Sequence, residues 1–181
     1  MNIVSINIKR GVLLVKRKRV ASMIQLGKVD VYFTQESKLP KLDSNLASLL
    51  WGDSNVEWSK FGIVGSTGAI FILCRKDLLK LSCSFKGEGF VGLNAEWKGR
   101  DLFFVNVFSS CALIIKRKLW RDLVATKNNF GRGDWLVGNG FNSATCSSER
   151  KGASGEGVEG RCWNSMAFIR GGKMDGLDGY G

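Results

Sequence analysis

Apolar residues occur along the first 140 residues in short blocks that are separated by polar or glycine-containing segments. Blocks of this kind, rich in β-branched and aromatic residues, are typical of strands with at least one buried face. The pattern predicts strands at residues 3–8, 29–34, 68–74, 81–85, 91–97, 102–108 and 135–137.

Three other segments place apolar residues at the spacing of a helix face. Their apolar stripes consist of Val20, Met23, Ile24 and Gly27; of Leu46, Leu49 and Leu50; and of Ile115, Leu119 and Leu123. Asp43 stands where its side chain can cap the second helix. The first and third helices carry basic runs on their other faces, namely Lys16, Arg17, Lys18 and Arg19, and Lys116, Arg117 and Lys118. Strands that alternate with amphipathic helices predict a layered α/β fold.

The chain changes character after Asn142. Residues 143–181 are rich in glycine and serine, with only a short apolar cluster at Trp163, Met166, Phe168 and Ile169. Such a segment is not expected to supply another sheet. The sequence therefore predicts a partial domain over residues 1–152 and a glycine-rich tail over residues 153–181.

The chain is strongly basic and contains no histidine. Its 181 residues include 27 Lys and Arg against 16 Asp and Glu, which gives a formal net charge of +11. This balance favours a polyanionic partner, such as nucleic acid or an acidic membrane surface. The lack of histidine excludes histidine-ligated zinc, a Ser-His-Asp triad and an imidazole general base.

The five cysteines are widely spaced and form no CxxC pair. The sequence therefore predicts neither a disulfide framework nor a zinc site, and Cys74 and Cys111 are expected to be buried, reduced thiols. The first residues lack the apolar core of a signal peptide, and no apolar run is long enough to span a membrane. We therefore expect an intracellular protein, nuclear or cytoplasmic, that is neither secreted nor inserted in a membrane.

Three polar residues interrupt or follow apolar strands, where a rigid scaffold can position functional groups. They are Asn7, Glu36 and Asn142. The carboxylate of Glu36 is a hard oxygen ligand suited to Mg²⁺. From the residues alone, two interpretations remain open: Glu36 can equally be a solvated loop residue, and Asn7 a structural amide.

Five separated segments resemble one known family, and they read MNIVSINIKRG, VDVYFTQESKL, STGAIFILCR, FFVNVFSS and DWLVGNGFNSATCSSERKG. In order and approximate spacing they resemble the endonuclease/exonuclease/phosphatase superfamily, and most closely the endonuclease module of plant LINE-type retrotransposons. The resemblance covers residues 1–152. It implies a four-layer αββα sandwich without its C-terminal part, and cleavage of phosphodiesters with one or two Mg²⁺ or Mn²⁺ ions.

The resemblance also implies roles for individual residues. Asn7 matches the asparagine that lies beside the metal in the family, and Glu36 matches the glutamate that ligates it. Asn142 matches the asparagine of the Gly-Asp-Phe-Asn motif, which orients the attacking water or the scissile phosphate. All three residues are intact.

Other positions depart from the family pattern. Gly140 replaces the aspartate of the Gly-Asp-Phe-Asn motif, and Phe108 stands where the family commonly has tyrosine. Asn139 is not expected to compensate, because neighbouring strand positions face opposite sides and an amide is not a base at neutral pH. The C-terminal Ser-Asp-His motif, which supplies the general base, is absent. Its loss also implies that the first sheet lacks a partner and exposes apolar surface.

The leading hypothesis is therefore a truncated and degenerate module of this family, derived from a retrotransposon, with little or no Mg²⁺-dependent nicking of DNA. No small-molecule cofactor is expected. One alternative is a non-catalytic, basic nucleic-acid-binding protein, and another is a relic without selected function. The basic runs keep two interpretations, either solvated helix faces or salt-dependent contacts to DNA phosphates.

Overall fold

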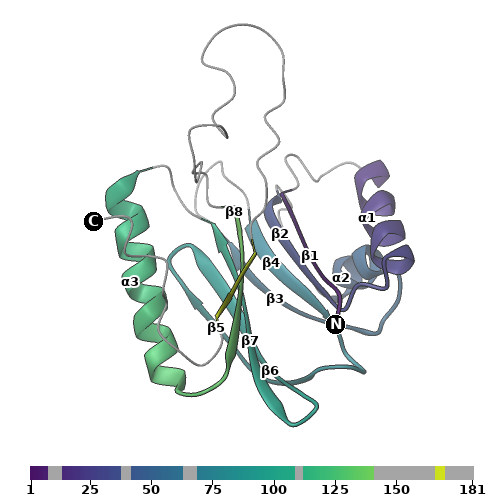
Figure 1. The fold of residues 1–181 in the computed structure, drawn as a ribbon. Coiled ribbons are helices and arrows are strands. Elements are labelled where there is room, and N and C mark those ends of the chain that lie inside the picture. Colours follow the sequence, from purple (N-terminus) through teal and green to yellow (C-terminus); the bar gives the residue numbers. More distant parts are fainter. Residues whose placement is uncertain (8–13, 38–41, 63–68, 109–111, 141–165, 170–181) are drawn as a thin grey trace, which may run out of the picture.

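Two β-sheets form the centre of the molecule (Figure 1). The structure is a computed structural model, and it describes residues 1–7, 14–37, 42–62, 69–108, 112–140 and 166–169. The first sheet has the order β1 (Ile3–Asn7), β2 (Val31–Ser37), β4 (Ala69–Arg75), β3 (Val56–Gly62). The second has the order β5 (Lys80–Gly87), β6 (Phe90–Trp97), β7 (Arg100–Phe108), β8 (Asp134–Gly140), β9 (Met166–Ile169).

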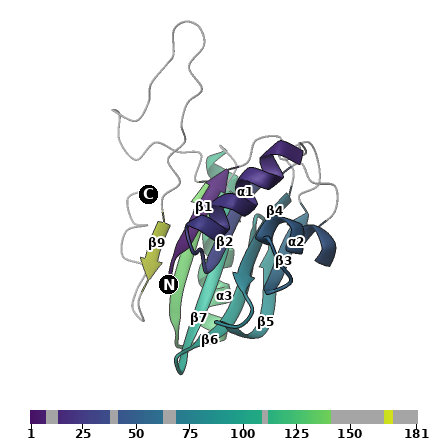
Figure 2. The ribbon, with the colours of Figure 1, turned by 90° about the vertical axis from the view of Figure 1, so that its right-hand side faces the viewer.

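Helices cover the outer face of each sheet. Helices α1 (Leu14–Leu26) and α2 (Ser44–Trp51) lie on the first sheet, and α3 (Leu113–Phe130) lies on the second (Figures 1 and 2). The molecule is thus a layered sandwich in the order helix, sheet, sheet, helix. The predicted α/β sandwich is confirmed.

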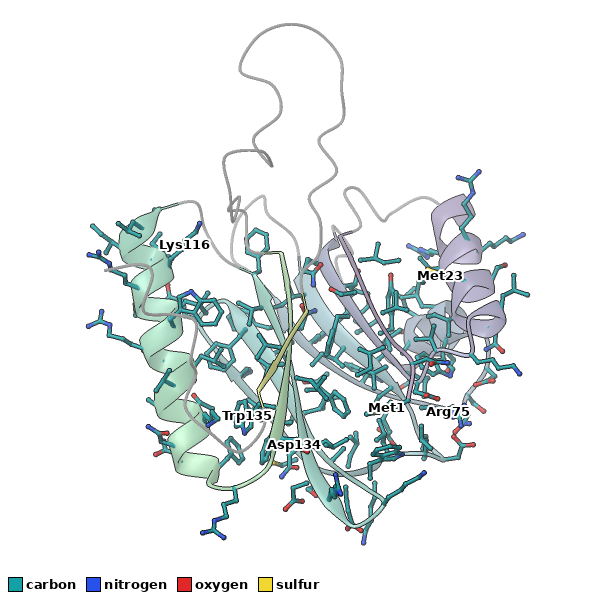
Figure 3. All side chains as sticks on the ribbon, in the orientation of Figure 1. Met1, Met23, Arg75, Lys116, Asp134 and Trp135 are labelled. Carbon is teal, nitrogen blue, oxygen red and sulfur yellow. The ribbon has the colours of Figure 1, made fainter. Side chains whose placement is uncertain are left out.

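Each interface between layers has its own apolar core. Val20 and Ile24 of α1 pack with Tyr32 and Leu73 of the first sheet. On the other side of the molecule, α3 buries Leu119 and Leu123 against β7 and β8, whose Phe103 and Trp135 stack at 4.6 Å between ring centroids (Figure 3). The alternation of side chains along each strand supplies these two outer cores and the core between the sheets.

The inner faces of the two sheets pack against each other. Val31, Phe33 and Ile72 of the first sheet share a cluster with Leu93 and Phe104 of the second, and all five are at most 1% exposed. The predicted unpartnered face of the first sheet is therefore wrong. The strands that cover it come from residues 80–108 and 134–140, which the chain contains.

A glycine lets the sheets approach closely where β8 faces β2. A Cβ atom at Gly138 would lie 2.2 Å from Cδ2 of Phe33, well inside van der Waals contact. Phe33 is fully buried, so the ring has little room to move. Gly138 therefore lies on the inner face of β8. Because strand residues alternate between faces, every second residue along β8 lies on the same inner face.

Two pairs of parallel strands are joined by crossover helices. β1 pairs with β2 so that Asn7 lies opposite Gln35, and β7 pairs with β8 so that Phe108 lies opposite Gly140. A crossover helix returns the chain to the start of the next parallel strand. Helices α1 and α3 therefore begin at the end of the sandwich where the parallel strands finish.

The short helix α2 begins where its sequence predicts, and a glycine ends it. The Asp43 carboxylate accepts a hydrogen bond from the backbone N–H of Leu46 at 3.0 Å, which satisfies one of the free donors of the first turn. Gly52 ends the helix with a φ of 105°, a conformation that glycine adopts without strain. The predicted cap is confirmed.

A buried carboxylate ties together the opposite end of the first sheet, where β1 and β2 start. Asp30 is 7% exposed. It accepts a hydrogen bond from the backbone N–H of Asn2 at 2.8 Å and pairs with Nη1 of Arg75 at 3.1 Å. These contacts join β1, β2 and β4 at the end that lies farthest from the candidate site.

Three features differ from the sequence prediction. Strand β3 was not predicted, because its residues combine charged and apolar side chains without a continuous apolar run. Strand β9 lies within residues 153–181 and adds one edge strand to the second sheet. Ile115 does not belong to the buried stripe of α3, since it is 47% exposed while Leu119 is 3% exposed.

A buried thiol and a buried phenol are expected to make the stability of the fold decrease at alkaline pH. Burial, with a contribution from Glu57, raises the pKa of Cys74 from 9.0 to about 12. Burial also raises the pKa of the Tyr32 phenol, whose oxygen has no hydrogen-bond partner among the described residues. The folded chain therefore keeps protons that the unfolded chain releases, so stability is full below about pH 9 and falls as the pH rises towards 12.

For Cys74 alone, this effect corresponds to about 2–3 kcal/mol lost by pH 11. Urea unfolding measured from pH 8 to pH 11 should show it. In Cys74→Ala the decline should become shallower, even though the variant is less stable at pH 8. Cys83→Ala is the matched control, because Cys83 is an exposed thiol. The expectation would be contradicted if the free energy of unfolding fell equally steeply with pH in the parent and in Cys74→Ala.

Candidate functional site

The last residues of four strands meet at one end of the sandwich. These residues are Asn7 of β1, Ser37 of β2, Phe108 of β7 and Gly140 of β8, and we call the end that they define the strand-end face. Asn106, near the end of β7, donates a hydrogen bond of 2.8 Å to the carbonyl of Thr34 in β2. The ends of β2 and β7 therefore lie together. In α/β proteins, such strand ends are common places for binding sites.

A buried amide pair joins the two sheets just inside the strand-end face. Nε2 of Gln35 donates to Oδ1 of Asn106 at 2.8 Å and to Oγ of Ser5 at 3.0 Å. Nδ2 of Asn106 donates to the carbonyls of Thr34 and Phe71, both at 2.8 Å. Gln35 and Asn106 are fully buried.

The orientation of both amides follows from this network. The two backbone carbonyls can only accept, so Asn106 must present its amide nitrogen to them and its oxygen to Gln35. Gln35 in turn must present its nitrogen to Asn106. Its Oε1 is then a buried acceptor without a hydrogen-bond partner among the described residues.

The inner faces of the strands bring three predicted site positions together. Ser5 and Asn106 face the other sheet through the amide network, and Gly138 faces it through its close approach to Phe33. Because strand residues alternate between faces, the positions two residues further on, Asn7, Phe108 and Gly140, also belong to inner faces. All three therefore lie on the inner side of the strand-end face.

Glu36 follows Gln35 directly and lies in β2, although the sequence places it after the strand. The register between β2 and β4 shifts between Thr34 and Ser37, and such an irregularity is common beside functional sites. The structure thus brings Glu36 to the end of β2, next to the strand that ends in Asn7. Asn142 lies outside the described residues.

The two basic runs begin at the strand-end face from opposite sides. Residues 16–19 lie in the first half of α1, and residues 116–118 lie at the end of the first turn and the start of the second turn of α3. Helix α1 covers the first sheet and α3 covers the second, so the runs belong to opposite outer layers (Figures 1 and 3). Both predicted basic helices form, and both place their basic runs near the helix N-terminus, which is the positive end of the helix dipole.

Some of these basic side chains have defined partners. Lys118 forms an ion pair with Glu88, which is in the turn between β5 and β6. This contact raises the pKa of Lys118. Lys18, Arg19 and Arg117 are exposed, and Lys116 and Arg17 are partly exposed. The runs can therefore reach a partner outside the protein.

The residues at the strand-end face suit the binding of an oxygen-ligated cation better than acid–base chemistry. Glu36 offers a carboxylate and Asn7 an amide oxygen, which are ligands that Mg²⁺ or Mn²⁺ accepts while it keeps several waters. Across the rest of the described chain, no group of three or more Cys, Asp or Glu side chains is placed to hold a metal. Gly140 has no side chain that could act as a base, and the Phe108 ring has no hydroxyl.

The sequence did not single out Asn106 or the buried role of Gln35. Asn106 is one polar residue within the apolar run FFVNVF. A fully buried amide in such a run requires hydrogen-bond partners, and this requirement is the signal that could have marked it. Its partner Gln35 is 71 residues away along the chain, so the sequence pattern could not identify that partner.

The fold is that of the endonuclease/exonuclease/phosphatase family. A member from Bacteroides vulgatus matches with a TM-score of 0.63 and 16% identity over 81% of this chain and 67% of that chain. The human nocturnin catalytic domain, solved with a bound sulfate anion, matches with a TM-score of 0.59 and 13% identity over 78% and 64%.

D. rerio TDP2, solved with a single-stranded DNA product, matches with a TM-score of 0.58 and 16% identity over 78% of this chain and 60% of that chain. The chain therefore spans only 60–67% of the length of these three structures. No sequence-family model and no curated protein sequence matches the chain. Among the described helices, none combines the length and the apolar character needed to cross a membrane.

Proposed function

We propose that this chain is a degenerate endonuclease/exonuclease/phosphatase module that binds DNA at its strand-end face and has lost most or all cleavage activity. The observation that carries the proposal is the meeting of Asn7, Glu36, Phe108 and Gly140 at the ends of four strands. Two basic runs flank this same face. The sequence resemblance supports an origin in a LINE-type retrotransposon and a partial domain over residues 1–152.

Glu36 and Asn7 are the residues that would hold Mg²⁺ or Mn²⁺. When bound, such an ion neutralises charge on phosphoryl oxygens and stabilises a leaving oxyanion. Within the chain, Glu36 supplies the negative charge and Asn7 a neutral amide. The Gln35–Asn106 pair holds the end of β2 against β7, so it positions Glu36 relative to the second sheet.

Cleavage needs groups that the chain lacks. A general base must accept the proton of the attacking water, and a donor must stabilise the charge that develops on the phosphate. Gly140 and Phe108 supply neither group, and no histidine is present to serve as base. Loss of one such group typically lowers the rate by about 10²–10⁴-fold, and groups that act together are not additive.

We therefore expect conversion of supercoiled plasmid to nicked circles at the background rate in the presence of Mg²⁺ or Mn²⁺. Agarose gels of a time course would measure it, with Glu36→Ala as the matched control for a contaminating nuclease. Background nicking should be identical in the parent and the variant. Nicking by the parent that disappears in Glu36→Ala would show that the chain retains catalysis.

A second candidate is a binding protein with no metal at all. The observation that favours it is the placement of the basic runs, which depends on the two crossover helices and not on Glu36. This candidate predicts that EDTA leaves the affinity for DNA unchanged. The metal-binding proposal predicts weaker binding in EDTA, and weaker binding in Glu36→Gln when Mg²⁺ is present. A fluorescence anisotropy titration with and without EDTA separates the two.

A further inference from the structure

The first turn of α3 exposes three consecutive large apolar side chains. Leu113 is 50% exposed, Ile114 82% and Ile115 47%. The other large apolar side chains that are exposed in the described chain occur singly: Leu26 in α1, Leu49 in α2, Met1 before β1, and Val124 farther along α3. A cluster of exposed apolar residues in one turn usually marks a contact surface.

The position of this turn explains why the described residues do not cover it. Helix α3 starts at the strand-end face, beyond the last residue of β7, and its buried residues begin only at Leu119. The Lys118–Glu88 ion pair holds the second turn to the β5–β6 turn. The first turn thus projects past the edge of the sheet that the rest of the helix covers.

Each apolar residue of this turn shares a helix face with a basic residue. Residues three apart lie on the same side of a helix, so Leu113 is followed by Lys116 and Ile114 by Arg117. Helix α3 as a whole carries five Lys and Arg residues against one acidic residue, Asp122. A partner that meets this face must therefore offer apolar surface and negative charge close together.

A polynucleotide has this combination, because its bases are flat and apolar on their faces and its phosphates are negative. Resting on the proposed function, we propose that Leu113, Ile114 and Ile115 contact the bases of DNA whose phosphates are bound by Lys116 and Arg117. The same strand would cross the strand-end face towards Lys18 and Arg19 of α1. Exposed bases are most accessible in single strands, so single-stranded DNA is the preferred form.

An acidic membrane would also offer apolar surface and negative charge. The geometry favours DNA, because the apolar residues occupy a single turn rather than a long helical stripe. The second basic run also lies in the opposite outer layer, where an extended polymer that crosses the end of the sandwich can reach it. A second copy of the chain offers no negative charge to match, since it carries the same excess of Lys and Arg.

The test compares two triple variants in fluorescence anisotropy with labelled single-stranded oligodeoxynucleotides. The first variant is Leu113→Ala, Ile114→Ala and Ile115→Ala, which keeps good helix formers in the turn. The matched control is Leu26→Ala, Leu49→Ala and Val124→Ala, which removes exposed apolar groups elsewhere. We expect the first variant to bind about 5- to 20-fold more weakly and the control to bind like the parent.

Two further readouts distinguish base contact from other causes. An oligonucleotide of sugar and phosphate without bases should bind the parent and the first variant equally. The dependence of affinity on salt should be the same in both, because apolar contacts release no counterions. If the triple variant unfolds, as judged by circular dichroism, Ile114→Ala alone takes its place, since this side chain is the most exposed of the three.

Several results would overturn the inference. Equal affinity of the parent and the first variant for base-bearing DNA would do so, and it would leave the proposed function intact. Binding of the parent, but not of the variant, to phosphatidylserine vesicles with DNA affinity unchanged would assign the turn to a membrane. A parent dimer that becomes a monomer in the variant, again with DNA affinity unchanged, would assign it to self-association. Failure of the parent to bind any DNA would instead reject the proposed function itself.

Discussion

Replacing Asn106 by leucine is expected to lower the free energy of unfolding by about 3–5 kcal/mol. Leucine has a similar volume, so packing changes little, but all three hydrogen bonds of the Asn106 side chain are lost. The carbonyls of Thr34 and Phe71 then remain buried without this donor, and each unsatisfied group costs about 1–3 kcal/mol. Urea unfolding followed by tryptophan fluorescence would measure the loss.

Asn94→Leu is the matched control for this substitution. Asn94 lies in β6 of the same sheet, but its Oδ1 is buried without a hydrogen-bond partner in the described chain. Removal of this amide should therefore change the stability by no more than about 1 kcal/mol. If Asn106→Leu were as stable as the parent, the amide pair would add nothing to the apolar core that joins the two sheets.

Raising the salt concentration from about 50 mM to about 200 mM is expected to weaken DNA binding by about 10²–10³-fold. The two basic runs contain seven residues, and Lys118 is already paired with Glu88. Some four to six contacts to phosphates would give a loss of about this size through the release of counterions. Anisotropy titrations at several salt concentrations would give the slope.

The contribution of the basic runs can be isolated with charge-matched variants. Lys18→Gln, Arg19→Gln, Lys116→Gln and Arg117→Gln together should make the slope markedly shallower. The control set consists of Lys28→Gln, Lys98→Gln, Arg100→Gln and Arg132→Gln, which lie next to the starts of β2, β7 and β8 and thus at the opposite end. Equal slopes for the two variants would mean that net charge, and not the strand-end face, attracts DNA.

Much of the fold could be predicted because single residues report their own environment. Apolar periodicity identified all three helices and most of the strands, and Asp43 identified the start of α2. Strand β3 escaped because an edge strand with charged residues, such as Glu57 and Lys60, has no continuous apolar run. Ile115 was assigned to the core because periodicity does not show where the underlying sheet stops.

The candidate site was less accessible to prediction from pattern alone. The strand pattern singled out Asn7 and Glu36, but only the resemblance gave them roles and added Phe108 and Gly140. The structure brings the backbone positions of all four to one end of the sandwich. The buried pair of Gln35 and Asn106 was not foreseen, because a hydrogen bond between distant residues leaves no periodic trace in the sequence. Pairings of this kind depend on the topology of the whole fold.

The long separation between Gln35 and Asn106 also bears on how the protein folds. Their hydrogen bond closes a loop of 71 residues, and it requires both sheets to be nearly in place. We expect this contact to form after the rate-limiting step of folding, because closing so long a loop costs conformational entropy before other contacts offset it. Asn106→Leu should therefore accelerate unfolding much more than it slows refolding. Because this pair lies beside Glu36, its opening would release the strand-end face before the rest of the sandwich separates.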